Sequence, residues 1–263
     1  MNDKNLMESG KMLWSTWEEG RKITGLPDRY KPKSKLEAYT IQQNVSRVSG
    51  SKQIGWKIAA TSQAGQEHIG VNGPLAGSIL ESQIKKTNEE VSLDNNIMKV
   101  AELEFGFKMG KDLPKTANDY SKDDVLNAID YLIPTIEIPD SRYLDFIKAG
   151  ETQLIADNAC AGWLFLGEPY REKITSRTNL IDHKVTALTD HNHEPTTGIG
   201  SNVLGDPLVA LTWLANELVK YGRFLAKGDL VSTGTCVTPI SISNAKEIKA
   251  DFGLYGKVTA KFS

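Results

Sequence analysis

Residues 100–107 read VAELEFGF, an apolar stretch that carries two carboxylates, Glu102 and Glu104. Side chains alternate between the two faces of a β-strand, so these carboxylates share one face while Leu103 and Phe105 share the other. Two neighbouring carboxylates repel each other, and removal from water strengthens the repulsion. A strand with one solvated face would tolerate them. If the face borders a cavity instead, a positive group must lie beside the pair.

A third carboxylate occurs in a second apolar segment, PTIEIP at 134–139, where Glu137 lies between Ile136 and Ile138. The segment is typical of a buried strand that stops at Pro139. Three carboxylates that converge from rigid strands form a site for a hard divalent cation, Mg²⁺ or Mn²⁺, because these ions prefer oxygen ligands. Zinc fits less well, since it favours His and Cys.

Lys57 lies in the middle of another expected strand, QIGWKIA at 53–59. The sequence leaves two interpretations of this lysine open. It either points outward into solvent, or its ammonium is partly desolvated beside an anionic substrate. In the second case it could also transfer a proton, because the pKa of a lysine shifts readily on burial.

The composition is that of an ordinary globular protein. The chain has 263 residues, 40% of them hydrophobic and 24% charged, and its formal net charge of −2 argues against nucleic-acid or anionic-membrane partners. Its two cysteines show no metal-finger spacing, which favours free thiols in the cytoplasm. The N-terminal stretch lacks the apolar core of a signal peptide, and no apolar run reaches the ~18 residues of a membrane span.

The first 52 residues are predicted to form a helical segment. The first helix is indicated by the recurrence of Leu6, Gly10, Leu13, Trp14 and Trp17. The second helix begins after Ser34, which forms a capping-box pattern with Glu37. Its buried side is expected to contain Leu36, Tyr39 and Val45.

Residues 53–263 are expected to form a catalytic domain of strands and shorter helices. Beyond those above, strands are predicted at 230–232, 247–252 and 257–262, and a turn at 73–77. Helices are predicted to begin at Ser62, at Ser121 and at Asp206, the helix after Ser121 continuing through Leu132. Helices first and strands later predict an α+β fold around a mixed sheet.

Several other polar motifs have plain structural explanations. Asp157 and Asn158 often shape a turn, and Arg142 is expected to pair locally within the turn at 140–142. The segment TGIGSNV at 197–203 lacks the third glycine of a dinucleotide-binding loop. The motif HNH at 191–193 is typical of a polar hairpin tip rather than a metal site.

Taken together, six fragments resemble the 2-keto-4-pentenoate hydratase and oxalocrotonate decarboxylase family within the fumarylacetoacetate hydrolase superfamily. Their order and spacing carry the resemblance, which extends from about residue 55 to residue 262. The fragments are GWKIAATS (55–62), AELEFGFKMGKDLP (101–114), IEIPDSR (136–142), LIADNACAG (154–162), NVLGDP (202–207) and STGT (232–235).

The resemblance implies a mixed β-roll with an N-terminal helical part packed against it. It also implies roles for particular residues, grouped here by role: Glu102, Glu104 and Glu137 as the Mg²⁺ (or Mn²⁺) ligands; Lys57, Asp157 and Asn158 as catalytic residues; and Thr235, Cys160 and Leu75 as substrate-binding residues. Two positions depart from the family. Leu75 occupies a place where many hydratases have an acid, and Cys160 one where a serine is common.

The resemblance implies a metal-dependent lyase that hydrates a 2-hydroxy-2,4-dienoate to a 4-hydroxy-2-oxo acid. A chelated cation would polarise the keto group of such a substrate and stabilise its enolate. Decarboxylation of a 2-oxo-enedioate uses the same electron sink and stays open. A non-catalytic 2-oxo-acid-binding subunit is a further alternative. The resemblance also implies a homo-oligomer, and a complex with a related decarboxylase is conceivable.

Overall fold

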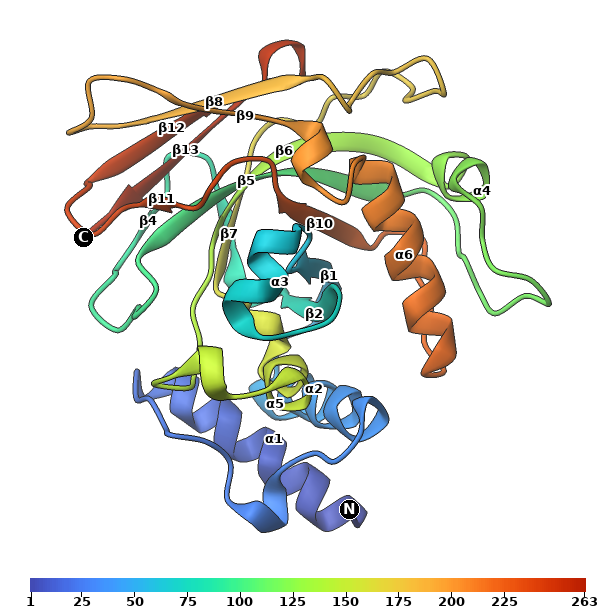
Figure 1. Ribbon diagram of the computed structural model, residues 1–263, viewed down its shortest axis with the longest axis vertical. Coiled ribbons are helices and arrows are strands. Elements are labelled where there is room, and N and C mark those ends of the chain that lie inside the picture. Colours follow the sequence, from blue (N-terminus) through green and yellow to red (C-terminus); the bar gives the residue numbers. More distant parts are fainter.

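The structure is a computed structural model that describes residues 1–263. Two β-sheets form the larger part of the molecule (Figure 1). The larger sheet has eight strands in the order β2-β1-β10-β5-β6-β7-β3, with β11 paired to β5, and the smaller has five in the order β4-β13-β12-β8-β9. The strands are β1 (Gln53–Ala59), β2 (Leu75–Leu80), β3 (Ile84–Lys86), β4 (Glu90–Val91), β5 (Val100–Met109), β6 (Ile129–Ile138), β7 (Trp163–Leu166), β8 (Lys184–Thr189), β9 (Thr196–Ile199), β10 (Leu230–Thr235), β11 (Ile240–Ser241), β12 (Glu247–Asp251) and β13 (Lys257–Phe262).

The apolar face of β5 packs on the smaller sheet. Leu103 and Phe105 are fully buried, and the Phe105 ring centroid lies 5.5 Å from that of Phe252 and 5.8 Å from that of Tyr255. In Figure 1 the smaller sheet accordingly lies over β5 and β6. Because side chains alternate along a strand, the acidic residues of β5 are turned away from this interface.

Six α-helices accompany the sheets: α1 (Asp3–Glu18), α2 (Lys35–Ser49), α3 (Gln63–Ile69), α4 (Lys122–Leu126), α5 (Glu151–Ala156) and α6 (Pro207–Lys220). The N-caps Ser34, Ser62, Ser121 and Asp206 each accept a backbone hydrogen bond as the sequence indicated. Helices α1, α2 and α5 gather at one end of the molecule, and α3 lies in front of β1 and β2 (Figure 1).

The N-terminal helices are joined to the sheet by a buried glutamine. Gln42 of α2 donates to the carbonyl oxygens of Ala76 on β2 and Ile155 on α5, and its own carbonyl accepts from Ser78. Burying the amide is tolerable because three of its bonds are satisfied. The division of the chain at residue 52 stays a prediction, since α2 packs closely on elements from beyond that residue.

Three details of the predicted elements are wrong. Leu36 is 58% exposed, because it lies on the outer side of α2, whereas Tyr39 and Val45 are buried as expected. Residues 75–77 belong to β2 rather than to a turn. The helix after Ser121 ends at Leu126, since the segment from Ile129 onward pairs with β5.

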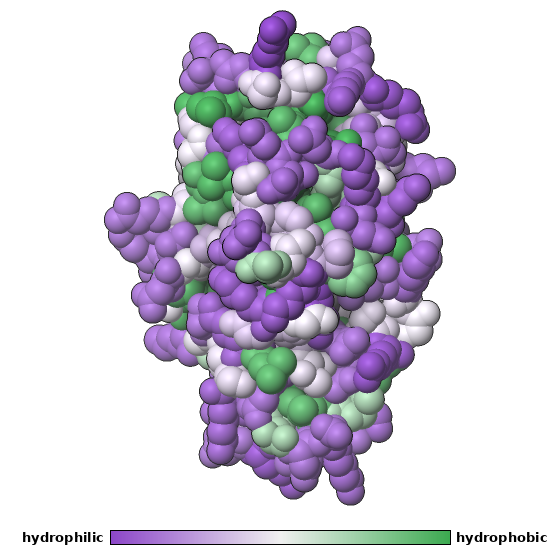
Figure 2. Space-filling view, turned by 90° about the vertical axis from the view of Figure 1, so that its right-hand side faces the viewer, coloured by the Kyte–Doolittle hydropathy of each residue, from purple (hydrophilic) through white to green (hydrophobic).

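The exposed face in Figure 2 is mostly hydrophilic, with small separated hydrophobic patches. None of the helices has both the length and the apolar character needed to cross a bilayer.

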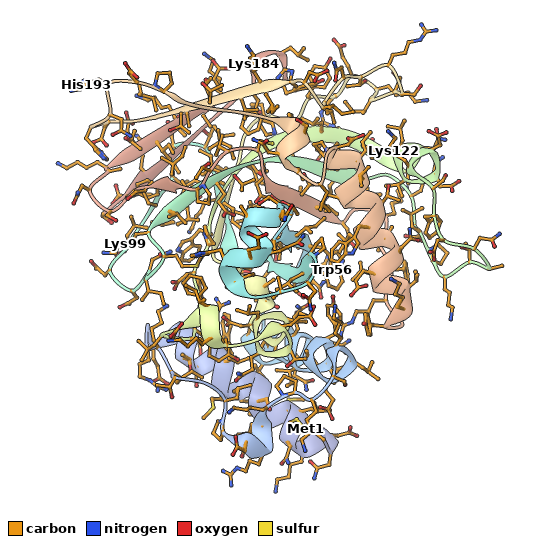
Figure 3. All side chains as sticks on the ribbon, viewed as in Figure 1. Met1, Trp56, Lys99, Lys122, Lys184 and His193 are labelled. Carbon is orange, nitrogen blue, oxygen red and sulfur yellow. The ribbon has the colours of Figure 1, made fainter.

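His193 lies at the tip connecting β8 and β9, away from the rest of the molecule (Figure 3), which confirms the expected hairpin. Trp17 does not reach outward: its ring lies 5.8 Å from that of Trp163 and under the Arg142 guanidinium.

The contact between α1 and α2 yields a stability prediction. A Cβ atom on Gly10 would lie 2.7 Å from Cβ of Asn44, closer than packing allows. We expect Gly10→Ala to lower the free energy of unfolding in urea by about 1–2 kcal/mol, because overpacking outweighs the better helix propensity of alanine. The matched control is Gly73→Ala, where the added Cβ has no atom within 4 Å. Equal stability of the two variants would contradict the close packing.

Candidate active site

Three carboxylates meet on one face of the larger sheet. Glu102 of β5 lies directly opposite Glu137 of β6, and Glu104 follows two residues along the same face. One oxygen from each of the three lies within 4.8 Å of the others. The convergence predicted from the sequence is therefore confirmed, and it arises because antiparallel pairing aligns two acidic strands in register.

The electrostatics of this cluster favour a bound cation. Burial raises the pKa of the Glu102 carboxyl to about 7, and it raises the pKa values of Glu104 and Glu137 as well. Glu104 Oε1 is buried and accepts no hydrogen bond, whereas Glu137 Oε2 has the Lys57 ammonium as its partner, 3.1 Å away. Buried carboxylate oxygens without donors are costly unless a charge compensates them. These residues fit a hard divalent ion such as Mg²⁺, which takes oxygen ligands.

The second oxygen of Glu104 is fixed by residues that were not singled out individually from the sequence. Glu104 Oε2 accepts from Ser232 Oγ at 2.5 Å and from the Gly234 amide at 2.9 Å. Thr135 Oγ1 lies 3.1 Å from Ser232 Oγ and extends the chain of hydroxyls. These contacts orient Glu104 so that Oε1 faces the other acids. In the sequence, only the resemblance of the fragment STGT (232–235) to the family pointed to these residues. Their hydrogen bonds to Glu104 depend on strand pairing, which the sequence does not reveal.

Lys57 points into the acidic cluster and is only 2% exposed, so the outward-facing interpretation is wrong. In the parallel pairing of β1 with β10 it lies opposite Ser232, on the face of the acids. Its Nζ lies 3.1 Å from Glu137 Oε2 and donates to the Ala159 carbonyl at 3.0 Å. Burial would lower the pKa of Lys57, but the attraction of the three carboxylates raises it, so the side chain is an ammonium.

Ala159 belongs to an unusual turn. Asn158, Ala159 and Cys160 have φ angles of 52°, 50° and 60°, three consecutive left-handed residues without glycine. Each such residue costs on the order of 1 kcal/mol, so surrounding contacts must hold the turn. Its close neighbour is Gly77 on β2, where a Cβ atom would lie 2.0 Å from the Asn158 carbonyl oxygen.

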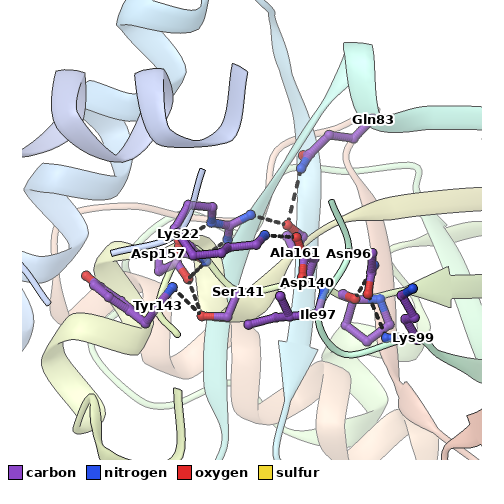
Figure 4. A network of polar contacts seen from close by, with 12 residues as sticks. Lys22, Gln83, Asn96, Ile97, Lys99, Asp140, Ser141, Tyr143, Asp157 and Ala161 are labelled. Carbon is purple, nitrogen blue, oxygen red and sulfur yellow. Dashed lines mark hydrogen bonds and ion pairs between the residues drawn. The ribbon is translucent and has the colours of Figure 1, made fainter. Parts of the chain in front are cut away.

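A buried ion pair holds the start of this turn (Figure 4). Arg142 is bonded through its side chain to the Asp157 carboxylate and to the backbone carbonyls of Asp157 and Ala161. Ser141 Oγ and the Arg142 amide also donate to Asp157 Oδ2, each at 3.0 Å. The expected local partner of Arg142 is wrong, because Asp140 pairs with Lys22 instead. Asp157 thus stabilises the turn that supplies the carbonyl contact of Lys57.

The acidic cluster opens onto a cavity of about 710 Å³. Five of the predicted site residues line it: Lys57, Leu75, Glu102, Cys160 and Thr235. Asp157 and Asn158 do not line it, since they face the Arg142 side of the turn. Burial raises the pKa of the Cys160 thiol to about 12, which leaves it neutral and a poor nucleophile at pH 7.

Comparison with known proteins identifies the family, although no family model matches the sequence. The chain is 31% identical over 261 residues to 2-keto-4-pentenoate hydratase 1 of Dechloromonas aromatica (strain RCB), covering 96% of this chain and 95% of that protein. The chain belongs to the 2-keto-4-pentenoate hydratase family. A second relative, 2-hydroxyhexa-2,4-dienoate hydratase of Comamonas testosteroni, is 31% identical over 89% of each chain.

Solved structures show that the fold of this family member is of the fumarylacetoacetate hydrolase type. The 4-oxalocrotonate decarboxylase from Pseudomonas putida G7, complexed with magnesium and adipate, superposes with a TM-score of 0.88 at 24% identity, over 100% of this chain and 99% of that one. A protein from Oleispira antarctica assigned as a fumarylacetoacetate isomerase/hydrolase gives 0.56 at 15% identity, over 80% and 94%. The predicted fold class is confirmed.

The raised carboxyl pKa values predict pH-dependent metal binding. A metal must displace protons from the cluster, and with the pKa of Glu102 at about 7 the carboxyl is mostly protonated at pH 6 and mostly ionised at pH 8. We expect the Mg²⁺ dissociation constant from calorimetry to be about 10-fold larger at pH 6 than at pH 8. In Glu102→Gln this difference should shrink while overall affinity falls. Equal affinity of the unmodified protein at both pH values would contradict the assignment.

Proposed function

We propose that this protein adds water to a 2-hydroxy-2,4-dienoate, giving a 4-hydroxy-2-oxo acid, with Mg²⁺ or Mn²⁺ as its cofactor. The observation that carries the proposal is the convergence of Glu102, Glu104 and Glu137 beside Lys57. Two of these residues, Glu102 and Lys57, line a cavity. The relatives named as hydratases of 2-keto-4-pentenoate and of 2-hydroxyhexa-2,4-dienoate support the reaction class. The magnesium in the P. putida G7 decarboxylase supports the choice of ion.

In this proposal, different residues of the site have different roles in the reaction. Glu102, Glu104 and Glu137 hold the ion, which when bound polarises the 2-keto group of the substrate. The Lys57 ammonium stabilises negative charge on the substrate carboxylate and on the C2 oxygen, because it is fixed in a site largely removed from water. Thr235 offers a hydroxyl at the cavity wall. The dienol loses its C2 hydroxyl proton and takes up a proton at C5 to become the 2-oxo-3-enoate. The hydroxyl of water then adds at C4, and a proton adds at C3 to give the 4-hydroxy-2-oxo acid.

Asp157 and Asn158 act indirectly in this proposal. The Arg142–Asp157 ion pair holds the left-handed turn, and the turn places the Ala159 carbonyl against Lys57. Cys160 and Leu75 contribute cavity wall, the first as a neutral thiol and the second as an apolar surface. We therefore assign Asp157 a positioning role rather than contact with the substrate.

The reaction is tested with purified protein and 2-hydroxypenta-2,4-dienoate. Loss of dienoate absorbance that requires Mg²⁺ and stops on addition of a chelator supports the hydratase. Release of CO₂ from a 2-oxo-enedioate, without hydration of the dienoate, would favour the decarboxylase alternative. Metal-bound protein with no turnover of either substrate would favour a non-catalytic binding subunit.

Lys57 provides a sharper test of the mechanism. We expect Lys57→Met to retain Mg²⁺ binding and to lower kcat by about 100-fold, because methionine keeps the stem but removes the stabilising charge. The control is Lys86→Met on the edge strand β3, where the side chain is exposed and kcat should not change. Unchanged kcat in Lys57→Met would remove this lysine from the mechanism.

Assembly is a separate proposal. We propose a homo-oligomer, and the exposed apolar side chains Leu144, Phe224 and Leu254 are available for an interface. Trp17 does not supply one, because its ring packs within the subunit. Light scattering at micromolar concentration tests this proposal, and co-purification with a related decarboxylase tests a mixed complex.

A further inference from the structure

The guanidinium of Arg142 is held both along its edge and on its face. Its edge, where the N–H donors lie, bonds the Asp157 carboxylate and the backbone carbonyls of Asp157 and Ala161. Its face lies against the indole of Trp17, with Cζ 5.1 Å from the ring centroid. An aromatic face attracts a cation within about 6 Å, most strongly where water is excluded. Arg142 is buried, so its contact with Trp17 is of this stronger, desolvated kind.

This contact joins two parts of the chain that are far apart in sequence. Trp17 belongs to α1, whereas Arg142 follows β6. The segment after α1 reaches the same place, because the Ile23 amide donates to the Arg142 carbonyl at 2.9 Å and the Leu144 amide donates to the Ile23 carbonyl at 2.8 Å. The N-terminal helix is therefore attached directly to the residue that supports the turn at 158–160.

Trp17 is itself held in place by a second ring. Its centroid lies 5.8 Å from that of Trp163, with an angle of 58° between the two ring planes. Trp163 begins β7 and pairs there with Ile138 of β6, and the Lys85 ammonium lies 4.8 Å from its ring centroid. The indole of Trp17 is thus fixed from the side of the sheet and presents a defined face to the guanidinium of Arg142.

The turn beneath Arg142 depends on contacts from outside itself. Residues 158–160 all have left-handed φ angles, which are unfavourable for residues with a side chain. Asn158 also has a buried side-chain oxygen without a hydrogen-bond donor. Strained backbone of this kind persists only where the surrounding structure holds it. If the hold of Arg142 weakened, the turn would relax, and the Ala159 carbonyl that accepts from Lys57 at 3.0 Å would move with it.

Building on the proposed function, in which Lys57 stabilises the reacting substrate, we infer that Trp17 is a positioning residue of the active site. Its ring holds the guanidinium of Arg142, the guanidinium holds the turn, and the turn fixes the lysine ammonium. Trp17 does not line the cavity, so it acts only through these groups. The N-terminal helix α1 therefore contributes to catalysis as well as to packing.

A double-mutant cycle tests the inference. Trp17→Met keeps an apolar side chain but removes the ring, and we expect kcat to fall about 5-fold, the scale of one cation–π contact, while the Mg²⁺ dissociation constant stays unchanged. In a Lys57→Met background, Trp17→Met should lower kcat no further, because the group that it positions is already gone. Equal fractional losses in both backgrounds overturn the inference, since they indicate a general structural effect.

Trp14 offers a matched control. It lies on the same helix and borders the same small void as Trp17, but it has no guanidinium over its ring. Trp14→Met should therefore leave kcat unchanged, and a loss equal to that of Trp17→Met overturns the inference. Tetrafluorotryptophan in place of Trp17 keeps the shape of the indole and weakens its attraction for cations. It should lower kcat about 3-fold and keeps the test available if Trp17→Met does not fold.

A measurement without substrate separates this inference from the proposed function. Reductive methylation of Lys57 with saturating Mg²⁺, followed by mass spectrometry, reports how often the ammonium leaves its position. We expect Trp17→Met to raise this rate about 5-fold and to leave that of the exposed Lys86 unchanged. If the rate rises but no dienoate is hydrated, Trp17 positions the lysine and the hydratase assignment fails. If the dienoate is hydrated and neither the rate nor kcat responds to Trp17→Met, only the inference fails.

Discussion

The mutual repulsion of three buried carboxylates is the constraint on which the rest of this structure depends. Glu102, Glu104 and Glu137 can share one sheet face only if positive charge offsets them. The chain supplies part of that charge through Lys57, whose ammonium lies 3.1 Å from Glu137. Glu104 Oε1, a buried acceptor without a donor, indicates where a divalent cation would supply the remainder. The positive charge that offsets the repulsion of the carboxylates therefore both stabilises the site and supplies its proposed chemistry.

Much of the surrounding structure serves to keep this arrangement rigid. Ser232 and Gly234 fix one oxygen of Glu104, and a strained left-handed turn presents the carbonyl that fixes Lys57. The strain of that turn is offset by the buried Arg142–Asp157 pair. Such support favours catalysis, because charged groups that are already oriented need no reorganisation when charge develops on the substrate.

Local sequence patterns predicted the elements whose residues interact within one segment. The serine and aspartate caps were correct because a cap bonds only a few residues away. The acidic cluster was also predictable, because carboxylates inside apolar strands must be offset by a positive group, which favours their convergence on one site. Where a segment's structure depends on a distant partner, the local pattern misled: residues 75–77 resembled a turn but pair with β1, and Ile129 followed a helical spacing but pairs with β5.

The sequence alone thus predicted the family, through the order of six fragments, and the α+β fold class. It also predicted the convergence of three acids, because carboxylates inside apolar strands are unusual, but it left the direction of Lys57 open. Only the tertiary structure decided how the remaining candidates act. It paired Arg142 with Asp157 rather than with its neighbour Asp140, and it left Asp157 and Asn158 outside the lining of the cavity. Both outcomes arise from contacts between segments far apart in the chain, which hydrophobic periodicity and motif spacing do not encode.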